Sequence, residues 1–153
     1  MAEKINIQTK YGDIVIETLP KIAPKHVKRI LELVRSGFYD GLTFHRVIKD
    51  FMAQTGCPNG DGTGGSGVKI PAEFSNEHFV RGSVGMARTH VPDSADSQFF
   101  ICLADCDFLD GKYTLWGHVI SGMEYVDKIT KGDIHDNGHV KNPDKIIKMT
   151  VID

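Results

Sequence analysis

The chain has 153 residues, 41% of them apolar, which is enough for one compact domain over residues 1–153 with a full-sized core. Its formal net charge of −2 argues against nucleic acid or an anionic membrane surface as the main partner. The chain has no apolar run of the ~18 residues that a membrane span needs, no signal-peptide core at its start and no disulfide-framework spacing among its three cysteines, so we expect a soluble, cytoplasmic protein.

Alternation of apolar and polar residues opens the chain. Residues 5–9 and 13–17 alternate on either side of Tyr11-Gly12, which predicts a β-hairpin. A helix is predicted to begin at Pro24, because proline needs no acceptor in the first turn. Apolar residues then recur at helical spacing until Gly37, which is typical of a helix stop.

The remaining segments are mostly strand-like. Their ranges are Phe44–Ile48, Met52–Thr55, Ser83–Ala87, Gln98–Leu103, Thr114–Ile120 and Ile146–Val151, and we expect the last to pair with the first strand. Asn59–Gly67 is a glycine-dense loop, and a second short helix is predicted from Gly122 to Gly132. Many short strands with only two helices favour a closed β-barrel with helical caps, since closure removes exposed sheet edges.

Two segments resemble ligand-binding loops, but their context argues against that. Gly60–Gly65 matches the G-x-G-x-x-G pattern of a dinucleotide site, which needs a strand before it and a helix after it. Residues 66–71 open no helix, so a surface loop is the better interpretation. In Asp105–Gly111, Leu109 stands where a calcium loop needs an oxygen ligand, and we expect a tight turn there instead.

Cysteine, histidine and serine residues give no stronger signal for a metal site or a hydrolase. Cys102 lies in an apolar strand four residues before Cys106, which favours a buried thiol over a zinc ligand. Residues 135–139 place two histidines around Asp136-Asn137-Gly138, a sequence suited to a turn with positive φ. Residues 90–97 hold serines, aspartates and a histidine without a G-x-S-x-G elbow, and a triad depends on geometry rather than local crowding.

One constellation remains, formed by an arginine, two glutamines and large apolar residues on predicted strands. Met52 and Gln54 lie two residues apart and so point to the same side of their strand, and the same holds for Gln98 and Phe100. If the two strands are neighbours, one surface presents two amides beside two apolar side chains. An ordinary core is the alternative, but it explains Arg46 and the glutamines poorly because unpaired polar groups are costly to bury. The mixture suits a site that grips an apolar ring and hydrogen-bonds the amide attached to it.

At these residues the chain resembles the cyclophilins, a family of peptidyl-prolyl cis-trans isomerases. The resemblance covers almost the whole chain, and its motifs are Phe44-His45-Arg46-Val47-Ile48, Phe51-Met52-Ala53-Gln54-Thr55-Gly56, Gly85-Met86-Ala87, Ser97-Gln98-Phe99-Phe100-Ile101 and Leu109-Asp110-Gly111-Lys112. It implies an all-β fold, a closed eight-stranded antiparallel β-barrel capped by two α-helices. It also implies an isomerase that acts on X-Pro bonds and assists protein folding, with no cofactor and no metal.

The resemblance assigns roles to single residues. Arg46 matches the family's catalytic arginine, and we expect Gln54 to share the catalytic role. The expected substrate-binding residues are Phe51, Met52, Ala87, Gln98, Phe100, Phe108, Leu109 and Tyr113. Phe108 and Tyr113 stand where many drug-binding eukaryotic members carry tryptophan and histidine, and they resemble bacterial members instead. We therefore expect reduced affinity for cyclosporin-type ligands but intact isomerase activity.

The resemblance also implies the partners. These are proline-containing peptides and unfolded or folded protein clients. From the residues themselves, we expect a monomer because no dedicated association stripe is visible, and the net charge and the lack of a long apolar run favour neither nucleic acid nor a membrane as a partner. The alternative is a proline-peptide binding module or chaperone that uses the same groove without essential turnover. The presence of Arg46 favours the enzyme, because binding alone would tolerate its loss.

Overall fold

The computed structural model describes residues 3–152 of the chain. Its strands are β1 (Lys4–Thr9), β2 (Gly12–Thr18), β3 (Arg46–Ile48), β4 (Met52–Thr55), β5 (Ser83–Met86), β6 (Phe99–Cys102), β7 (Leu115–Ser121) and β8 (Lys148–Ile152). Its α-helices are α1 (Pro24–Arg35) and α2 (Met123–Val126), and its 3-10 helices are η1 (Asp107–Leu109) and η2 (Ile134–Asp136). Over these residues, every helix is too short or too polar to cross a bilayer.

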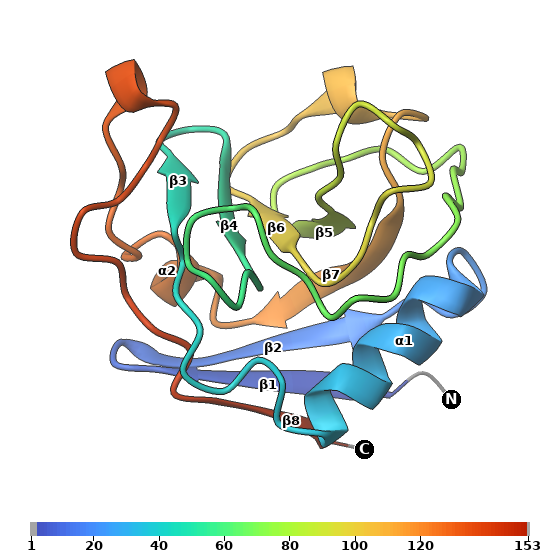
Figure 1. Cartoon of the computed structure of the whole chain (residues 1–153), viewed down its shortest axis with the longest axis horizontal. Coiled ribbons are helices and arrows are strands. Elements are labelled where there is room, and N and C mark those ends of the chain that lie inside the picture. Colours follow the sequence, from blue (N-terminus) through green and yellow to red (C-terminus); the bar gives the residue numbers. More distant parts are fainter. Residues whose placement is uncertain (1–2, 153) are drawn as a thin grey trace.

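All eight strands join one antiparallel sheet in the order β3-β4-β6-β5-β7-β2-β1-β8 (Figure 1). Each predicted strand is confirmed to within a few residues. The last strand pairs with the first, with Gln8 opposite Lys148 and Lys4 opposite Ile152, as the sequence predicted. The first and last strands therefore lie side by side at one side of the sheet, while β3, β4 and β6 lie together at the other.

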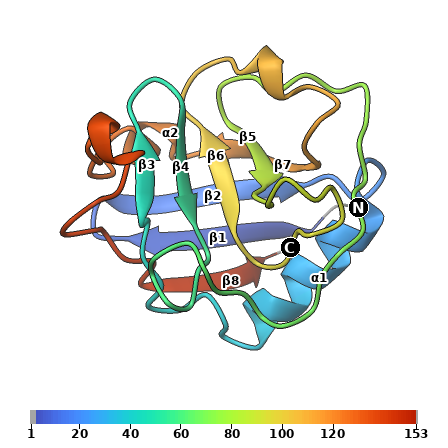
Figure 2. The same ribbon diagram turned by 45° about the horizontal axis from the view of Figure 1, so that its top comes forward.

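The expected closure of the barrel is wrong: within residues 3–152 the strands β3 and β8 are the two edges of an open, strongly curled sheet (Figure 2). The irregular segment 138–146 lies along β3 and its approach, with isolated bridges from Arg46 to His139 and from Thr43 to Lys145. Pro143 in this segment has no N–H, so it cannot donate to a ladder of hydrogen bonds between strands. The irregular segment therefore covers the outer edge of β3, and this edge does not pair with β8.

Helix α1 has the predicted limits, since it spans Pro24–Arg35 and Gly37 follows at φ +79°. Its first turn leaves backbone N–H groups without partners inside the helix. The carboxylate of Glu73, from a distant loop, accepts the N–H of His26 at 2.8 Å and that of Lys25 at 3.2 Å. A negative charge at this end of the helix is also favourable to its dipole, so Glu73 ties the loop to the helix.

Helix α2 is shorter than predicted, because only Met123–Val126 is helical within the expected range 122–132. The following residues tighten into i→i+3 turns, in which the N–H of Ile129 bonds the carbonyl of Val126 at 3.1 Å. The next N–H, that of Thr130, donates to the Asp144 carboxylate at 2.8 Å instead of to the helix. A side-chain acceptor from the C-terminal segment therefore ends the helix.

Two clusters of buried side chains fill the fold. The larger one joins α1 to the sheet, and its members include Ile5, Ile14, Ile30, Phe99 and Trp116. The smaller one contains Met52, Phe79, Phe100, Cys102, Cys106, Leu109 and Leu115. Gly85 is required there, since a Cβ at this position would lie 2.6 Å from the Phe79 ring and 2.8 Å from the Phe100 ring. The smaller cluster lies behind the candidate site.

Candidate active site

Neighbouring strands bring the predicted polar residues together. β3 pairs with β4 so that Arg46 lies opposite Gln54, and β4 pairs with β6 so that Gln54 lies opposite Phe100. Gln98 immediately precedes β6. The sequence predicted a shared surface only if these two strands are neighbours, and the pairing of β4 with β6 meets that condition. The period-2 alternation of side chains then sets both amides on one surface.

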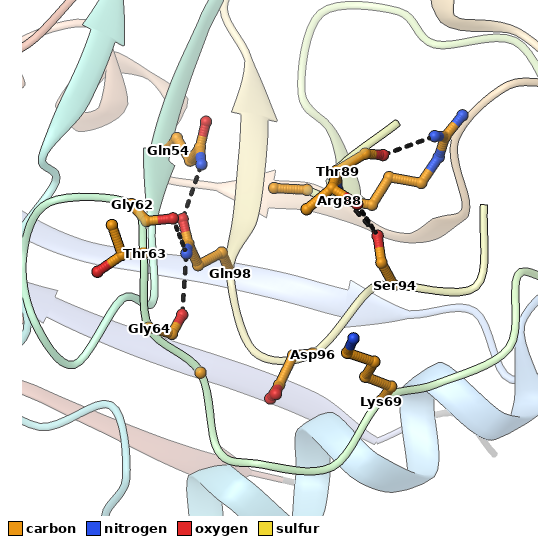
Figure 3. A pocket seen from close by; sticks show the side chains of 12 residues that line it. Gln54, Gly62, Thr63, Gly64, Lys69, Arg88, Thr89, Ser94, Asp96 and Gln98 are labelled. Atoms are coloured by element: carbon orange, nitrogen blue, oxygen red, sulfur yellow. Dashed lines mark hydrogen bonds between the residues drawn. The ribbon is translucent and has the colours of Figure 1, made fainter. Parts of the chain in front are cut away.

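A chain of hydrogen bonds links these polar side chains. Arg46 Nη1 donates to Gln54 Oε1 at 3.0 Å, and Gln54 Nε2 donates to Gln98 Oε1 at 2.9 Å. Gln98 Nε2 then donates to the carbonyl oxygens of Gly62 and Gly64, both at 2.9 Å (Figure 3). Each carboxamide is held at both of its ends, so its oxygen and nitrogen have defined directions.

The Arg46 guanidinium has a second anchor. Its Nε donates to the Asn137 carbonyl at 2.9 Å and its Nη2 donates to Asn137 Oδ1 at 3.2 Å. With the Gln54 bond, three of the five N–H groups of the guanidinium have partners, and one N–H on each terminal nitrogen remains. Burial lowers the pKa of Arg46 from its ordinary value, yet an arginine side chain stays protonated in proteins. Within residues 3–152 it makes no ion pair with a carboxylate.

A pocket of about 130 Å³ opens beside the guanidinium. Its lining residues are Arg46, Phe51, Met52, Gln54, Ala87, Arg88, Phe100, Leu109 and Tyr113. Met52, Phe100 and Leu109 are at least 94% buried and belong to the smaller core cluster, so this wall is close-packed from behind. The pocket thus combines an apolar recess with a cation and an amide at its edge.

A larger pocket of about 310 Å³ adjoins the first and shares Gln54, Ala87 and Arg88 with it. Its other lining residues are Gly62, Thr63, Gly64, Gly65, Lys69, Thr89, Ser94, Asp96 and Gln98 (Figure 3). Most of the side chains in this lining are polar, and they carry charges of both signs. The smaller pocket has the apolar walls and Arg46, so a ligand held there would extend its flanking parts into the larger one.

Phe108 and Tyr113, both expected to bind substrate, lie in different places. Phe108 is 58% exposed and lies outside the lining of the small pocket, with its ring centroid 5.5 Å from that of Phe51. Tyr113 lines the pocket, edge-on to Phe100 with centroids 5.9 Å apart. The guanidinium carbon of Arg88 lies 4.6 Å from the centroid of the Tyr113 ring, close enough for a cation–π contact. Tyr113 is therefore held by Phe100 and Arg88, whereas Phe108 reaches the pocket through its contact with Phe51.

The loop whose carbonyl groups accept hydrogen bonds from Gln98 is itself held by hydrogen bonds to the sulfur atom of Cys57. Cys57 is fully buried, and its Sγ accepts the N–H groups of Gly62 and Gly64 at 3.3 Å each. Burial raises the pKa of the Cys57 thiol, but hydrogen bonds from surrounding backbone N–H groups outweigh it and leave this pKa below its ordinary value. The N–H groups that would hold a phosphate in a dinucleotide loop bind this sulfur instead.

The other motifs raised by the sequence serve the backbone. Ser97 Oγ donates to the Gly56 carbonyl and Ser94 Oγ to the Val91 carbonyl, both at 2.7 Å, so neither hydroxyl is paired with a base. Within the described part of the chain, no three His, Cys, Asp or Glu side chains are arranged to hold a metal ion. The arrangement around Arg46 can therefore bind an apolar ring and donate hydrogen bonds, without a nucleophile.

Sequence reasoning missed Asn137, Arg88 and Cys57 as parts of the site. The turn at residues 136–138 was predicted, and Asn137 adopts its positive φ of +55°. Its contact with Arg46 joins residues 91 positions apart, which no local pattern reveals. Arg88 directly follows the expected site residue Ala87, and this adjacency is the one signal that the sequence offered.

Comparison with known proteins identifies relatives along the whole chain. The family model for "Cyclophilin type peptidyl-prolyl cis-trans isomerase/CLD" matches residues 4–151. A Brucella abortus protein named "Probable peptidyl-prolyl cis-trans isomerase" is 55% identical over 95% of this chain and 80% of its own length. A Helicobacter pylori protein named "Peptidyl-prolyl cis-trans isomerase" is 46% identical over 84% of this chain and 80% of its own length.

Solved structures agree with this result. A cyclophilin-type peptidyl-prolyl cis-trans isomerase from Cryptosporidium parvum superposes with a TM-score of 0.91 at 28% identity, covering 100% of this chain and 99% of the other. Its crystal structure in the presence of the dipeptide Ala-Pro gives a TM-score of 0.88 at 29% identity, covering 98% and 99% of the two chains. The chain therefore shares its overall fold with these proteins.

Proposed function

This chain belongs to the cyclophilin-type peptidyl-prolyl cis-trans isomerases and catalyses rotation about X-Pro peptide bonds, and from that premise we propose how its residues divide the reaction. Arg46 and Gln54 act on the rotating amide, and the small pocket holds the proline ring. The observation that supports this assignment most is a guanidinium with two unused N–H groups beside an apolar recess.

The reaction is a rotation with a high electronic barrier. Twisting a peptide bond costs ~18–20 kcal/mol because amide resonance is lost. For X-Pro bonds both isomers are populated, and unaided exchange takes on the order of tens to hundreds of seconds. In the twisted transition state the proline nitrogen regains a lone pair that the planar amide lacks. A donor directed at this nitrogen therefore binds the transition state better than the substrate, which is the condition for catalysis.

Arg46 meets that condition in its chemistry and its setting. A guanidinium remains charged and donates from a rigid fork. Its Nε and one N–H on each terminal nitrogen are occupied by Asn137 and Gln54, so its plane is fixed before substrate arrives. Partial burial strengthens a hydrogen bond from the remaining N–H groups, since the local dielectric is lower than in water.

Gln54 has one group left for the substrate. Its Oε1 accepts a hydrogen bond from Arg46, and one N–H of its Nε2 donates to Gln98. The second N–H of Nε2 is then free to donate to the carbonyl oxygen of the residue before proline. Phe51, Met52, Phe100 and Leu109 surround the ring in this assignment. Rotation then occurs about a fixed proline, while Gln98 and the larger pocket contact flanking residues of the peptide.

The required stabilisation is within reach of these groups. An acceleration of ~10⁴–10⁶ corresponds to roughly 5.5–8 kcal/mol of differential stabilisation of the transition state. A hydrogen bond from a charged donor contributes ~1.5–3 kcal/mol. Orientation of the bound amide and exclusion of water from the pocket supply the rest.

Steady-state isomerisation of an X-Pro tetrapeptide tests the role of Arg46. We expect Arg46→Ala to lower kcat/KM by ~10²–10³ with an unchanged fold, by analogy with loss of an oxyanion donor. Arg46→Lys keeps a positive charge but cannot bond Asn137 and Gln54 with a planar fork, so most of the loss should persist. Arg35→Ala removes an exposed arginine at the end of α1 and is the matched control. A folded Arg46→Ala enzyme with wild-type kcat/KM would refute the assignment.

We further propose that the ligands are proline-containing peptides and the unfolded or folded proteins that carry them. The Ala-Pro dipeptide in the Cryptosporidium parvum crystal supports this class. Phe108 and Tyr113 stand where many drug-binding eukaryotic members carry tryptophan and histidine, and this is the reason to expect reduced affinity for cyclosporin-type ligands. The family match over residues 4–151 supports a single isomerase domain, which we propose acts as a monomer. Three free, buried cysteines suit a reducing compartment such as the cytoplasm.

A further inference from the structure

The loop that contacts Arg46 is fastened to the strand that carries this residue. The carbonyl of Val47 accepts the N–H of Gly132 at 2.8 Å, and the N–H of Val47 donates to the carbonyl of Gly138 at 2.9 Å. On the other side of Arg46, the carbonyl of His45 accepts the N–H of Val140 at 3.1 Å. The loop is thus bonded to the backbone immediately before and after Arg46.

The loop is also closed on itself. The carbonyl of Asp133 accepts the N–H of Gly138 at 2.8 Å, and its carboxylate accepts the N–H of His135 at 2.9 Å. Gly132 permits this closure, since a Cβ there would lie 1.8 Å from the Gly138 carbonyl oxygen. Asn137 stands at the tip of the closed loop with φ +55°, a left-handed conformation that asparagine tolerates better than most residues.

The tip presents two acceptors to one guanidinium. The Asn137 carbonyl binds Nε and its side-chain Oδ1 binds Nη2, at 2.9 and 3.2 Å. Both acceptors are neutral, and so is Oε1 of Gln54 on the third side. The guanidinium is therefore oriented from two directions while its full positive charge is left for the substrate. A carboxylate at either position would orient it equally well but would offset that charge.

We propose that Asn137 is a positioning residue for Arg46, and that its neutral carboxamide holds the guanidinium without offsetting its charge. This inference rests on the proposed role of Arg46. Asn137→Gly keeps the left-handed backbone and the carbonyl acceptor but loses Oδ1. Asn137→Asp keeps an acceptor oxygen and tolerates the same backbone, but adds a negative charge beside the guanidinium. The two variants separate orientation from charge.

Isomerisation kinetics of the purified full chain on an X-Pro tetrapeptide test the proposal. Asn137→Gly is expected to lower kcat about three- to tenfold with little change in KM, because one exposed hydrogen bond to a charged group is lost. Asn137→Asp is expected to lower kcat by a similar or larger factor, and 1 M NaCl should recover part of this loss, since salt screens exposed charges. Salt should not restore Asn137→Gly.

Controls distinguish the failure of this proposal from the failure of the function assigned to Arg46. Asn142→Asp makes the same chemical change at another exposed position of the C-terminal segment and should keep wild-type activity. Thermal unfolding verifies that each variant is folded. If Arg46→Ala loses activity while both Asn137 variants equal the wild type, the positioning role is wrong. If Asn137→Asp alone equals the wild type, the requirement for a neutral carboxamide is wrong. An active Arg46→Ala enzyme would instead remove the premise.

Discussion

Phe99 and Phe100 are adjacent on β6 and point to opposite faces of the sheet, so the pair separates core packing from ligand binding. Phe100 is 5% exposed, stacks on Phe79 with centroids 5.9 Å apart and lines the small pocket. Phe99 is fully buried in the larger cluster, with Tyr39 and Trp116 edge-on to it at 5.4 and 5.6 Å. Truncating each ring should therefore have different consequences.

Replacement of a core phenylalanine by alanine costs ~3–5 kcal/mol of unfolding free energy. Phe99→Ala should fall near the top of that range, because rings on either side enclose the cavity left behind. Phe100→Ala should fall near ~3 kcal/mol, because its cavity opens into the pocket and can fill with water. Only Phe100→Ala should raise KM, by about tenfold, which corresponds to ~1.4 kcal/mol of lost ring contact.

Urea unfolding and isomerisation kinetics measure the two effects on the same samples. A loss of ~4–5 kcal/mol is a large part of a domain's free energy of unfolding, and an alanine variant can therefore be largely unfolded. Phe99→Leu and Phe100→Leu make the same comparison with a smaller loss of stability. The expected pattern is a larger loss of stability at Phe99 and a rise in KM at Phe100 alone. Equal changes in KM for the two folded variants would refute the separation of core and pocket.

Two further predictions concern pH and the Cys57 loop. Burial lowers the pKa of His26 and His45 below 6.5, so the unfolded chain binds more protons and the free energy of unfolding should fall as pH drops below ~6.5. His45→Gln should flatten this slope between pH 7.5 and 5.5 in urea titrations, and a slope equal to that of the wild type would contradict the prediction. Cys57→Ala removes the acceptor for Gly62 and Gly64 and should cost ~1 kcal/mol of stability with a several-fold rise in KM. Cys57→Ser, which keeps an acceptor, should lie between, and a wild-type KM for Cys57→Ala would show that the loop holds Gln98 without the sulfur.

Local patterns were sufficient to predict the strands, α1 and the pairing of β8 with β1. They were also sufficient to predict that Gln54 lies on the same side as Met52, and Gln98 on the same side as Phe100, because side-chain alternation is a property of each strand alone. That the two strands are neighbours came from the structure. The fully buried strands β5 and β6 were recognised from composition and length rather than from alternation.

What the sequence did not predict depends on contacts between distant segments. The barrel does not close because irregular chain, rather than β8, lies along β3. Helix α2 is short because the Asp144 carboxylate accepts the hydrogen bond from the N–H of Thr130. Asn137 lies in a turn that was predicted, but its bonds to Arg46 exist only because Val47 fastens the loop beside it. Such contacts form only in the tertiary structure, so no periodic pattern of residue types in the sequence reveals them.

In the proposed mechanism, Arg46 stabilises the twisted amide more than either planar isomer. Nuclear magnetic resonance of a proline peptide tests this most directly, because titration gives the dissociation constant and exchange spectroscopy gives the rate of cis-trans interconversion on the enzyme. For Arg46→Ala we expect a dissociation constant within about twofold of wild type and an on-enzyme rate lower by ~10²–10³. A mutant that binds the peptide far more weakly but interconverts it at the wild-type rate would contradict the claim, since Arg46 would then serve binding alone.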